Sequence, residues 1–397
     1  MNVLVANVGS TSFKYKLFDM TDETVLAEGR IERMGEASSP AAHKVKGEES
    51  FRGELYIPDF PSAVRNALEY VERAVGSLSK LSAVGFKTVH LKDEPGAYLL
   101  TEDVLSKMEE YNFVAPQHNP PYIRAIRTFK ELLPDVPLVG LFEPAFHRDL
   151  PDYAYVYGVP YRWYEEYGIR RYGFHGASHR YISEHVPEVL GVPVEGLRLI
   201  SCHLGGSSSV CAVLGGRSVD TSMGFSPQEG VLNSTRTGDV DVFAVLYVME
   251  REELTPSQMA EVLCRQGGLL GISGLSGDVR DLEEAAESGN YRARLALEAF
   301  CYGVKKYIGA YAAVLGGLDV LAFAGGIGER GWKVRERICR GLEFLGVRID
   351  LKSNRSLEGE GLISEHDSPV KVLVVRTDEE LIVARETRKV VEGLGRR

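Results

Sequence analysis

The sequence predicts an α/β protein made of two related lobes, and a repeated supersecondary unit is the main reason. Residues 3–35 hold three short runs of strand-like alternation, and the Gly/Ser turn VGSTS joins the first two. Residues 197–224 repeat this order of strand, Gly/Ser turn, strand, Gly-Gly turn and strand. Helical and strand-like segments alternate after each copy. Such a duplication predicts two α/β lobes, with turns of both lining a cleft.

In the first half, hydrophobic spacing identifies the remaining elements. Helices are expected over 60–78, over 101–113 and, after a Pro-rich entry, within 116–134. Strands are expected over 81–91 and at the start of 136–146, where an acidic loop follows. Thr101 is a suitable N-cap for its helix, since two acidic residues follow in the first turn. The polar stretch 36–60 predicts a loop or an irregular hairpin.

In the second half, the repeated strands are followed by a helix-rich region. Helical segments are expected over 255–265, 282–317 and 332–345, and a last helix over 379–394. Strands are expected at the start of 320–329 and over 370–377. Residues 147–170, rich in Tyr and Pro, predict a linker or a seam between domains. We expect a first lobe of residues 1–146 with the C-terminal helix 381–397, and a second lobe of residues 147–380.

Length and composition narrow the class of protein. A chain of 397 residues exceeds the ~250–300 residues at which single cores stop growing, so two domains are expected. The net charge of −10 argues against a general nucleic-acid binder, although a nucleotide ligand remains compatible. No run is long and apolar enough to cross a membrane. Five cysteines without CxxC spacing predict a reduced, cytoplasmic protein and give no support for zinc or a disulfide framework.

Three glycine-rich turns could present backbone N–H groups and hydroxyls to phosphate. They are VGSTS, HLGGSSS at 203–209 and AGGIGER at 324–330. One such turn is a weak signal, because a solvated hairpin has the same composition. Two turns at equivalent places in two lobes strengthen the hypothesis that they bind phosphate. The third turn is expected to be a loop between a strand and a helix, where free N–H groups can also face phosphate. The chain has no GxxxxGK[ST] motif, so a nucleotide would bind through another architecture.

Longer motifs carry a family resemblance across almost the whole chain. NVGSTSFKYKLFD, RYGFHGASHR, HLGGSSSVCAV, NSTRTGDVD, AGGIGER and TDEELIVARET occur in that order. Together they resemble acetate kinase and its acyl-kinase relatives, members of the sugar kinase/Hsp70/actin superfamily. The resemblance implies duplicated actin-like, ribonuclease-H-like lobes and ATP/ADP as co-substrate. It also implies Mg²⁺ or Mn²⁺, and a homodimer formed through the second lobe.

The same resemblance implies roles for particular residues. The implied catalytic residues are Glu143, His175 and Arg236. The implied metal-site residues are Asn7 and Glu379. The implied substrate residues are Lys87, Val89, Gln117, Phe174 and Pro227. The implied nucleotide-binding residues are Ser10, Ser12, Lys14, His203, Gly205, Gly206, Ser207, Asp278, Arg280, Gly326, Gly328, Glu329 and Arg330.

Each of these residue types also has an ordinary structural explanation. Arg236 could form a salt bridge with Asp239 or Asp241 instead of contacting phosphoryl oxygens bidentately. Asn7 could be a turn residue, and Glu379 could complement the dipole of the last helix. His179 and His203 are expected to support the site rather than to react.

The chain departs from the family pattern mainly on the acyl side. Lys87 stands where the family motif HRVVHGGE has arginine, and a lysine cannot reproduce a bidentate clamp. Glu143 replaces the aspartate of FDTAFH, Gly206 the asparagine of HLGNG, and Arg330 the asparagine of GIGEN. Gln117 replaces the leucine of APLHNP. A buried amide needs a polar partner, so Gln117 could select a polar or longer acid, or could bond to backbone at the pocket rim.

The predicted function is therefore reversible, ATP-dependent phosphorylation of a short-chain carboxylate, by direct in-line transfer with Mg²⁺. Nucleotide and carboxylate are the expected partners, without nucleic acid or membrane. Two alternatives stay open: a kinase for another acceptor or phosphate donor, and a nucleotide-binding sensor with weakened catalysis.

Overall fold

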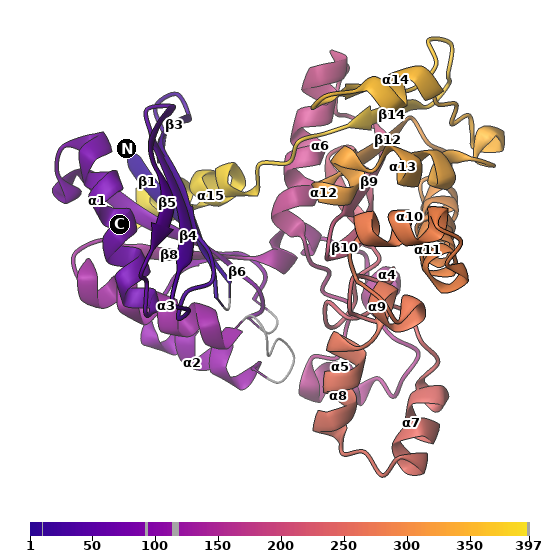
Figure 1. Ribbon diagram of the computed structural model, residues 1–397, viewed down its shortest axis with the longest axis horizontal. Coiled ribbons are helices and arrows are strands. Elements are labelled where there is room, and N and C mark those ends of the chain that lie inside the picture. Colours follow the sequence, from indigo (N-terminus) through magenta and orange to yellow (C-terminus); the bar gives the residue numbers. More distant parts are fainter. Residues whose placement is uncertain (10, 92–93, 113–118, 395–397) are drawn as a thin grey trace. The chain divides into compact units, whose positions relative to one another are not determined.

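The computed structural model describes residues 1–9, 11–91, 94–112 and 119–394 (Figure 1). The chain divides into two compact units, which are described separately. Unit 1 comprises residues 1–148 and 378–397, and unit 2 comprises residues 149–377. Each unit has its own sheet and its own hydrophobic core.

Unit 1 is built on an eight-stranded sheet with the order β5-β4-β3-β2-β1-β6-β8-β7. Its strands are β1 (Asn2–Val8), β2 (Phe13–Asp19), β3 (Thr24–Ile31), β4 (Ser39–Val45), β5 (Glu48–Leu55), β6 (Leu81–Thr88), β7 (Ala97–Leu99) and β8 (Leu138–Phe142). Strands β1 to β5 form an antiparallel meander, and β1, β6 and β8 pair in parallel. The polar stretch 36–60 therefore contains the β4–β5 hairpin, whose register shifts between His43 and Lys44.

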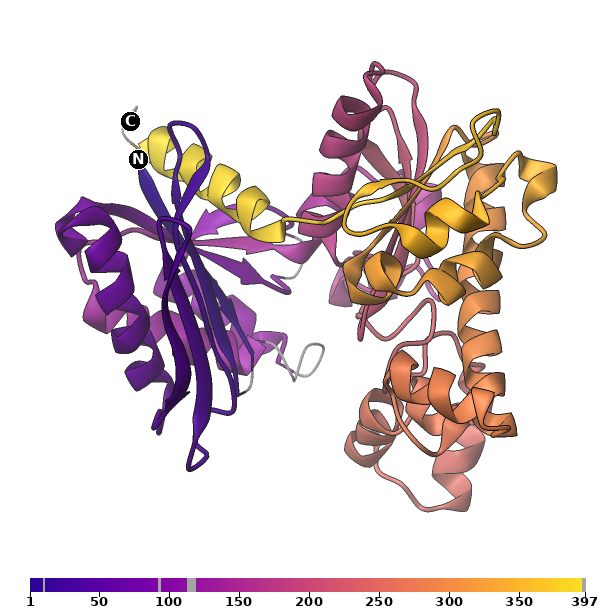
Figure 2. The same cartoon turned by 45° about the horizontal axis from the view of Figure 1, so that its top comes forward.

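Helices cover both faces of this sheet. They are α1 (Phe60–Val75), α2 (Glu102–Glu110), α3 (Asn119–Leu132) and α15 (Glu379–Leu394), with 3-10 turns at Leu78–Lys80 and Glu143–His147. Helix α1 lies against β3 and β4, and α15 lies against β1, β6 and β8 (Figure 2). Gly85 of β6 permits the close approach of α15, since a Cβ there would collide with Thr387 and Val383. Thr101 caps α2 as expected, accepting from Val104 N.

Unit 2 repeats the strand plan on a six-stranded sheet with the order β11-β10-β9-β12-β14-β13. Its strands are β9 (Arg198–Leu204), β10 (Ser208–Leu214), β11 (Arg217–Thr221), β12 (Val320–Ala324), β13 (Gly361–Leu362) and β14 (Lys371–Val374). As in unit 1, a three-stranded antiparallel meander places its first strand beside two parallel strands. This repetition confirms the predicted duplicated α/β fold.

The helices of unit 2 differ from expectation at several places. The helices are α4 (Asp152–Tyr155), α5 (Arg162–Tyr167), α6 (Gly176–Leu190), α7 (Val242–Arg251), α8 (Pro256–Arg265), α9 (Gly268–Ser273), α10 (Val279–Glu287), α11 (Tyr291–Val314), α12 (Gly325–Arg330), α13 (Trp332–Cys339) and α14 (Leu351–Ser356). The stretch 147–170 forms α4 and α5 rather than a plain linker. The glycine cluster at 324–330 forms the short helix α12 instead of a loop. The helix expected over 332–345 ends at Cys339, because Gly341 and Gly346 adopt positive φ.

Candidate active site

Polar side chains of unit 1 gather where its parallel strands end. Asn7 lies near the end of β1, Lys87 near the end of β6, and Glu143 directly after β8. Because neighbouring parallel strands end at the same edge of a sheet, these side chains are brought together there. Glu379 joins them as the first residue of α15, although it lies more than 230 residues from Glu143 in the sequence.

Lys87 is the cation of this cluster. Its Nζ lies 3.2 Å from Glu143 Oε1 and also forms an ion pair with Glu379. Burial disfavours the ammonium, but the carboxylates of Glu379 and Glu143 outweigh it and hold the pKa of Lys87 well above its usual value. The lysine that replaces the family's arginine therefore remains charged and contacts both carboxylates.

Asn7 is held by neighbours on two other elements. Its Nδ2 donates to Glu380 Oε1 at 3.4 Å, and its Oδ1 accepts from Tyr122 OH at 3.4 Å. Val8 N donates to the same Tyr122 oxygen at 3.2 Å. Burial raises the pKa of Tyr122 to about 12, so the phenol stays protonated at neutral pH. The sequence motifs did not point to Tyr122, which lies on a helix expected only from its apolar spacing.

These oxygens suit a hard divalent cation. Mg²⁺ in proteins takes one or two carboxylates and completes its shell with water and substrate phosphate. Glu379, Glu143 and the Asn7 amide offer such ligands, and the Lys87 ammonium already contacts both carboxylates. Within the described residues no group of three or more His, Cys, Asp or Glu side chains could hold a metal.

The first Gly/Ser turn is only partly described. Gly9 N donates to Ser12 O at 2.8 Å and closes the turn. Lys14 follows on β2, exposed and directly opposite Asn7. Ser10, predicted to face phosphate, and Gln117, predicted to line the acyl pocket, lie outside the described residues.

In unit 2, two distant motifs meet at one hydroxyl. His175 Nε2 lies 2.9 Å from Ser207 Oγ, and Arg236 Nη2 donates to the same oxygen. His175 Nδ1 lies 2.7 Å from Ser209 Oγ on β10. Burial lowers the pKa of Arg236 to about 10, which still leaves the guanidinium charged at neutral pH. Motifs of the sequence separated by some sixty residues are thus joined through Ser207 of the second Gly/Ser turn.

The backbone of His175 is unusual and places it at a helix end. His175 has φ 57° and ψ 26°, a left-handed conformation that is uncommon for a residue with a side chain. It directly precedes α6, whose N-terminal N–H groups carry partial positive charge. Strained conformations of this kind concentrate at functional sites. Together with Arg236, the arrangement can attract an anion.

Arg236 is free of the salt bridge that would have explained it structurally. Asp239 Oδ1 accepts from Gly230 N at 2.9 Å and its Oδ2 accepts from Tyr307 OH at 2.7 Å. Asp241 caps α7 by accepting from Phe243 N at 2.7 Å. Over the part of the chain that the structure describes, neither aspartate forms an ion pair with Arg236.

Two further histidines support this cluster through serines. His179 Nδ1 lies 2.8 Å from Ser201 Oγ, and its Nε2 lies 2.7 Å from Ser209 Oγ. His203 Nδ1 lies 2.8 Å from Ser178 Oγ. The rings therefore tie α6 to the strands that carry the Gly/Ser turn.

Helix α12, formed by the third glycine cluster, is stabilised by hydrogen bonds from the Arg335 side chain to its backbone carbonyls. Arg335 is 1% exposed, and its Nη1 donates to Gly328 O at 2.7 Å and Glu329 O at 2.8 Å. Its Nε donates to Asn354 Oδ1 at 2.8 Å. Gly326 and Glu329 are half-buried, Gly328 is buried and Arg330 is exposed. The sequence motifs did not identify Arg335.

The pair predicted near adenine, Asp278 and Arg280, is engaged locally. Asp278 Oδ1 accepts from Arg280 N at 2.8 Å and caps α10, while the two side chains form an ion pair at 2.5 Å. Gly205 and Gly206 lie in the turn between β9 and β10, where Ser234 N donates to Gly206 O at 3.0 Å. The turn is thereby connected to the segment that carries Arg236.

The predicted acyl-pocket residues are apolar and buried, but they belong to different units. Val89 is in unit 1, whereas Phe174 and Pro227 are in unit 2. An unpredicted network fixes the segment around Pro227. Arg171 donates to Glu229 Oε1 at 2.6 Å and to the Thr221 and Ser222 carbonyls, and Tyr157 OH donates to Glu229.

The duplicated α/β fold, with a half-buried Arg–His–Ser cluster in unit 2, fits a phosphotransferase of the actin-like class. A family model described as the acetokinase family matches residues 2–385. The acetate kinase of Dictyoglomus turgidum is 48% identical over 98% of this chain and 98% of its own length. The acetate kinase of Carboxydothermus hydrogenoformans is 46% identical over 98% of this chain and 99% of its own length.

Solved structures agree with this assignment. The acetate kinase of Porphyromonas gingivalis, 39% identical, superposes with a TM-score of 0.87 over 98% of this chain and 99% of that one. A propionate kinase from Francisella tularensis, 32% identical, gives a TM-score of 0.89 over 98% and 99% of the two chains. The chain belongs to the acetokinase family. It is a phosphotransferase with a carboxyl group as acceptor and ATP or ADP as nucleotide co-substrate.

Proposed function

We propose that the chain catalyses reversible phosphoryl transfer between ATP and acetate, giving ADP and acetyl phosphate. The convergence of His175 and Arg236 on Ser207 Oγ carries this proposal, because it offers charged and neutral donors to one group of oxygens. The names of the relatives support acetate as the acid. They do not favour a sensor or a kinase for an unrelated acceptor.

In this reaction the protein mainly positions groups and stabilises charge. Phosphoryl transfer spreads charge over three equatorial oxygens, and fixed donors aimed at those oxygens lower the barrier. Arg236 and His175 would supply them. The second Gly/Ser turn would present the Ser207 hydroxyl and the N–H groups of Gly205 and Gly206 to the nucleotide phosphates. Arg335 would stabilise the conformation of α12 beside the nucleotide.

The unit 1 cluster would serve the carboxylate and the metal. Lys87 would attract the substrate carboxylate, and Glu143 would orient it or a metal-bound water. Asn7 and Glu379 would hold Mg²⁺ in concert with the phosphates. Mg²⁺ held there would neutralise part of the charge of the phosphates.

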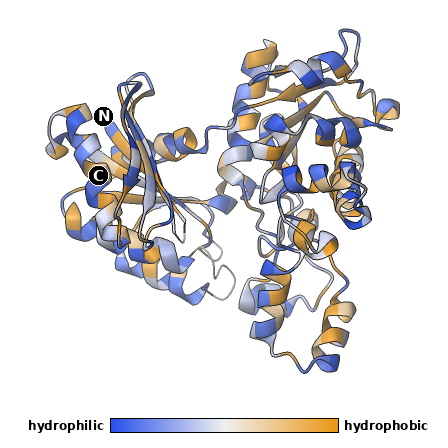
Figure 3. Ribbon diagram, viewed as in Figure 1, coloured by the Kyte–Doolittle hydropathy of each residue, from blue (hydrophilic) through white to orange (hydrophobic). Residues whose placement is uncertain are grey.

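We also infer a homodimer formed through unit 2. Helix α7 contains many apolar residues (Figure 3), and none of its residues is buried. Four of its apolar side chains are largely exposed. They are Val242 (67%), Phe243 (80%), Leu246 (51%) and Tyr247 (57%). An apolar surface of this kind is typical of a protein–protein contact.

None of the described helices is long and apolar enough to cross a membrane, and the free, buried cysteines are compatible with a cytoplasmic enzyme.

The test is acyl phosphate formation, trapped with hydroxylamine, with ATP, Mg²⁺ and a panel of acids. The panel contains formate, acetate, propionate, butyrate and hydroxy- and dicarboxylic acids. We expect the highest kcat/KM on acetate. A maximum on propionate or on a polar acid would move the assignment within the family and make Gln117 the first residue to substitute. ATP binding without turnover on any acid would contradict the proposal and support a sensor.

A further inference from the structure

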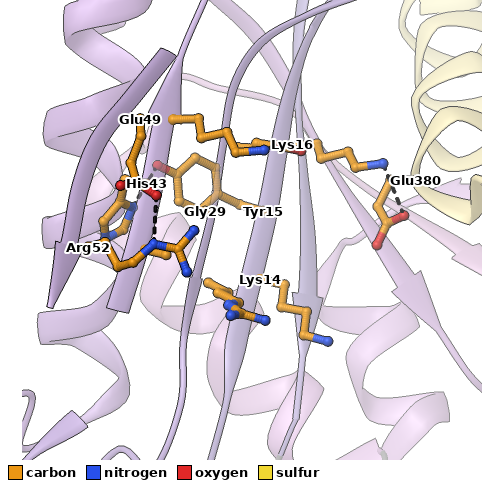
Figure 4. Close-up of a pocket in the computed structure, with 12 residues that line it drawn as sticks. Lys14, Tyr15, Lys16, Gly29, His43, Glu49, Arg52 and Glu380 are labelled. Carbon is orange, nitrogen blue, oxygen red and sulfur yellow. Dashed lines mark hydrogen bonds and ion pairs between the residues drawn. The ribbon is translucent and has the colours of Figure 1, made fainter. Parts of the chain in front are cut away.

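A group of cations separate from the Lys87 cluster lies on the sheet of unit 1, over strands β2 to β5. A cavity of about 310 Å³ opens on this face and is lined by those strands and by Glu380 of α15 (Figure 4). Its volume is at the lower end of the ~300–1,000 Å³ typical of ligand pockets. Five of the side chains that line it are basic and three are acidic, in a chain whose net charge is −10. The cavity is thus locally cationic in an acidic protein.

The strand register divides these charges into two rows. In the first row Lys14 lies opposite Arg30, Arg30 opposite Ala42, and Ala42 opposite Arg52. We call Lys14, Arg30 and Arg52, with Ala42 among them, the cationic row. It contains three cations, one small apolar residue and no acid.

The neighbouring row alternates in charge and serves as an internal comparison. Lys16 lies opposite Glu28, Glu28 opposite Lys44, and Lys44 opposite Glu49. Lys44 and Glu28 form an ion pair at 2.9 Å. Lys16 pairs with Asp378 at 3.0 Å. The charges of this second row are therefore compensated within the protein.

The cationic row is much less compensated. Arg52 contacts Glu49 at 2.6 Å, but Lys14 and Arg30 are exposed and have no ion-pair partner among the described residues. Like charges directly opposite each other destabilise a sheet. An anion bound above Ala42 would relieve this repulsion, and the small side chain of Ala42 leaves room for it.

We propose that the cationic row binds a condensed phosphate, an anion with two or more linked phosphoryl groups. Strands are spaced by about 4.8 Å, so the row spreads its three cations over about 14 Å of sheet. That spread suits several linked anionic groups better than one phosphate. Arginine side chains bind phosphate bidentately and are the better test of such a site. Lys14 is also an implied nucleotide-binding residue, whereas Arg30 and Arg52 have no part in the proposed phosphoryl transfer. The test therefore uses the two arginines.

Calorimetric titration of the full chain with inorganic tripolyphosphate tests the site. ADP is kept saturating and divalent ions are omitted, at constant ionic strength, so that the nucleotide site is filled. The variants are Arg30→Gln and Arg52→Gln. The matched control is Lys44→Gln, from the second row, whose charges are compensated within the protein. Inorganic phosphate is the second probe. Circular dichroism melts check that every variant folds.

We expect tripolyphosphate to bind the wild type and each arginine variant to bind it at least about fivefold more weakly. Lys44→Gln should stay within about twofold, and inorganic phosphate should bind more weakly than tripolyphosphate in every protein. Equal binding in all four proteins would place the anion elsewhere and overturn the proposal. Equal weakening in Lys44→Gln would mean that tripolyphosphate is attracted by the general positive charge of this face and not by the cationic row, which would overturn the proposal. The absence of binding by the wild type would also overturn it. None of these outcomes depends on turnover, so they stand apart from the acyl phosphate assay.

Discussion

At the scale of single residues, the two clusters use charge in opposite ways. In unit 1, the Lys87 ammonium is surrounded by the carboxylates of Glu143 and Glu379. In unit 2, the Arg236 guanidinium donates to a neutral hydroxyl, and burial lowers its pKa to about 10. This half-buried guanidinium donates to a hydroxyl and not to a carboxylate, so its positive charge is not compensated by that partner. The unit 2 cluster is therefore suited to phosphoryl oxygens and the unit 1 cluster to a cation and a carboxylate.

Arg236→Ala should lower kcat by about 10²–10³ because it removes a preorganised donor to the developing charge. The KM for ATP should change by less than about threefold, since other groups bind the nucleotide. Steady-state kinetics with ATP and acetate measure both constants. Arg340→Ala is the control, because Arg340 is exposed, pairs with Glu336 and has no assigned role in the reaction. A loss confined to KM would show that Arg236 binds the nucleotide without acting on the transferred group.

Lys87→Met should destabilise unit 1 by about 2–4 kcal/mol, because it leaves two partly buried carboxylates without their cation. Lys87→Arg keeps the charge and should recover most of the stability. Because the pKa of Lys87 is raised in the folded protein, its contribution is fully present below the unfolded value of about 10.4. It is lost only as the pH rises through the higher folded value.

Urea unfolding at several pH values measures this contribution. The difference between wild type and Lys87→Met should be constant from about pH 7 to 9 and should shrink above about pH 10.4. A difference that already shrinks between about pH 7 and 9 would assign the effect to another titrating group.

At the scale of elements, local signals predicted most helices and strands, and non-local contacts account for the failures. Asp59 and Gly76 cap the two ends of α1, at the positions where the helical spacing of apolar residues begins and ends in the sequence. The glycines of α12 were expected in a loop, yet Arg335, from the following helix, binds the Gly328 and Glu329 carbonyls. Tyr122 and Glu380 reach Asn7 from other elements for the same reason. Such contacts depend on tertiary packing and leave no periodic trace in the sequence.

Helix α7 provides the prediction at this scale. If α7 forms the proposed homodimer contact, Phe243→Glu should convert that dimer to a monomer, because it places a charge in the middle of an apolar contact. Size-exclusion chromatography with light scattering measures the mass. Phe344→Glu is the matched control, since Phe344 is 79% exposed in the same unit but lies on a different element. Equal dissociation by both variants, or by neither, would exclude α7 as the dimer contact.

At the scale of the whole molecule, the duplicated plan makes unit 1 discontinuous in sequence. Motif order and the repeated Gly/Ser turn were sufficient to predict two lobes. Only the structure shows how α15 completes the first one, through Gly85 and the salt bridge of Arg385 with Glu23 at 2.7 Å. The chain must therefore be synthesised almost to its end before unit 1 is complete.

A chain that ends at Thr377 should fail to form a stable unit 1 while unit 2 still folds. The deletion uncovers Val3, Val5 and Gly85 on the face that α15 covers, and it removes Glu379 from Lys87. Unit 2 keeps its own core of buried residues from Ile200 to Val374. Limited proteolysis with mass spectrometry should yield a resistant fragment of roughly residues 149–377 and rapid digestion of the rest. A chain that ends at Leu394 retains α15 and should resist cleavage in both units. Equal protection of residues 1–148 in the two truncated chains would mean that α15 is not needed for the stability of unit 1.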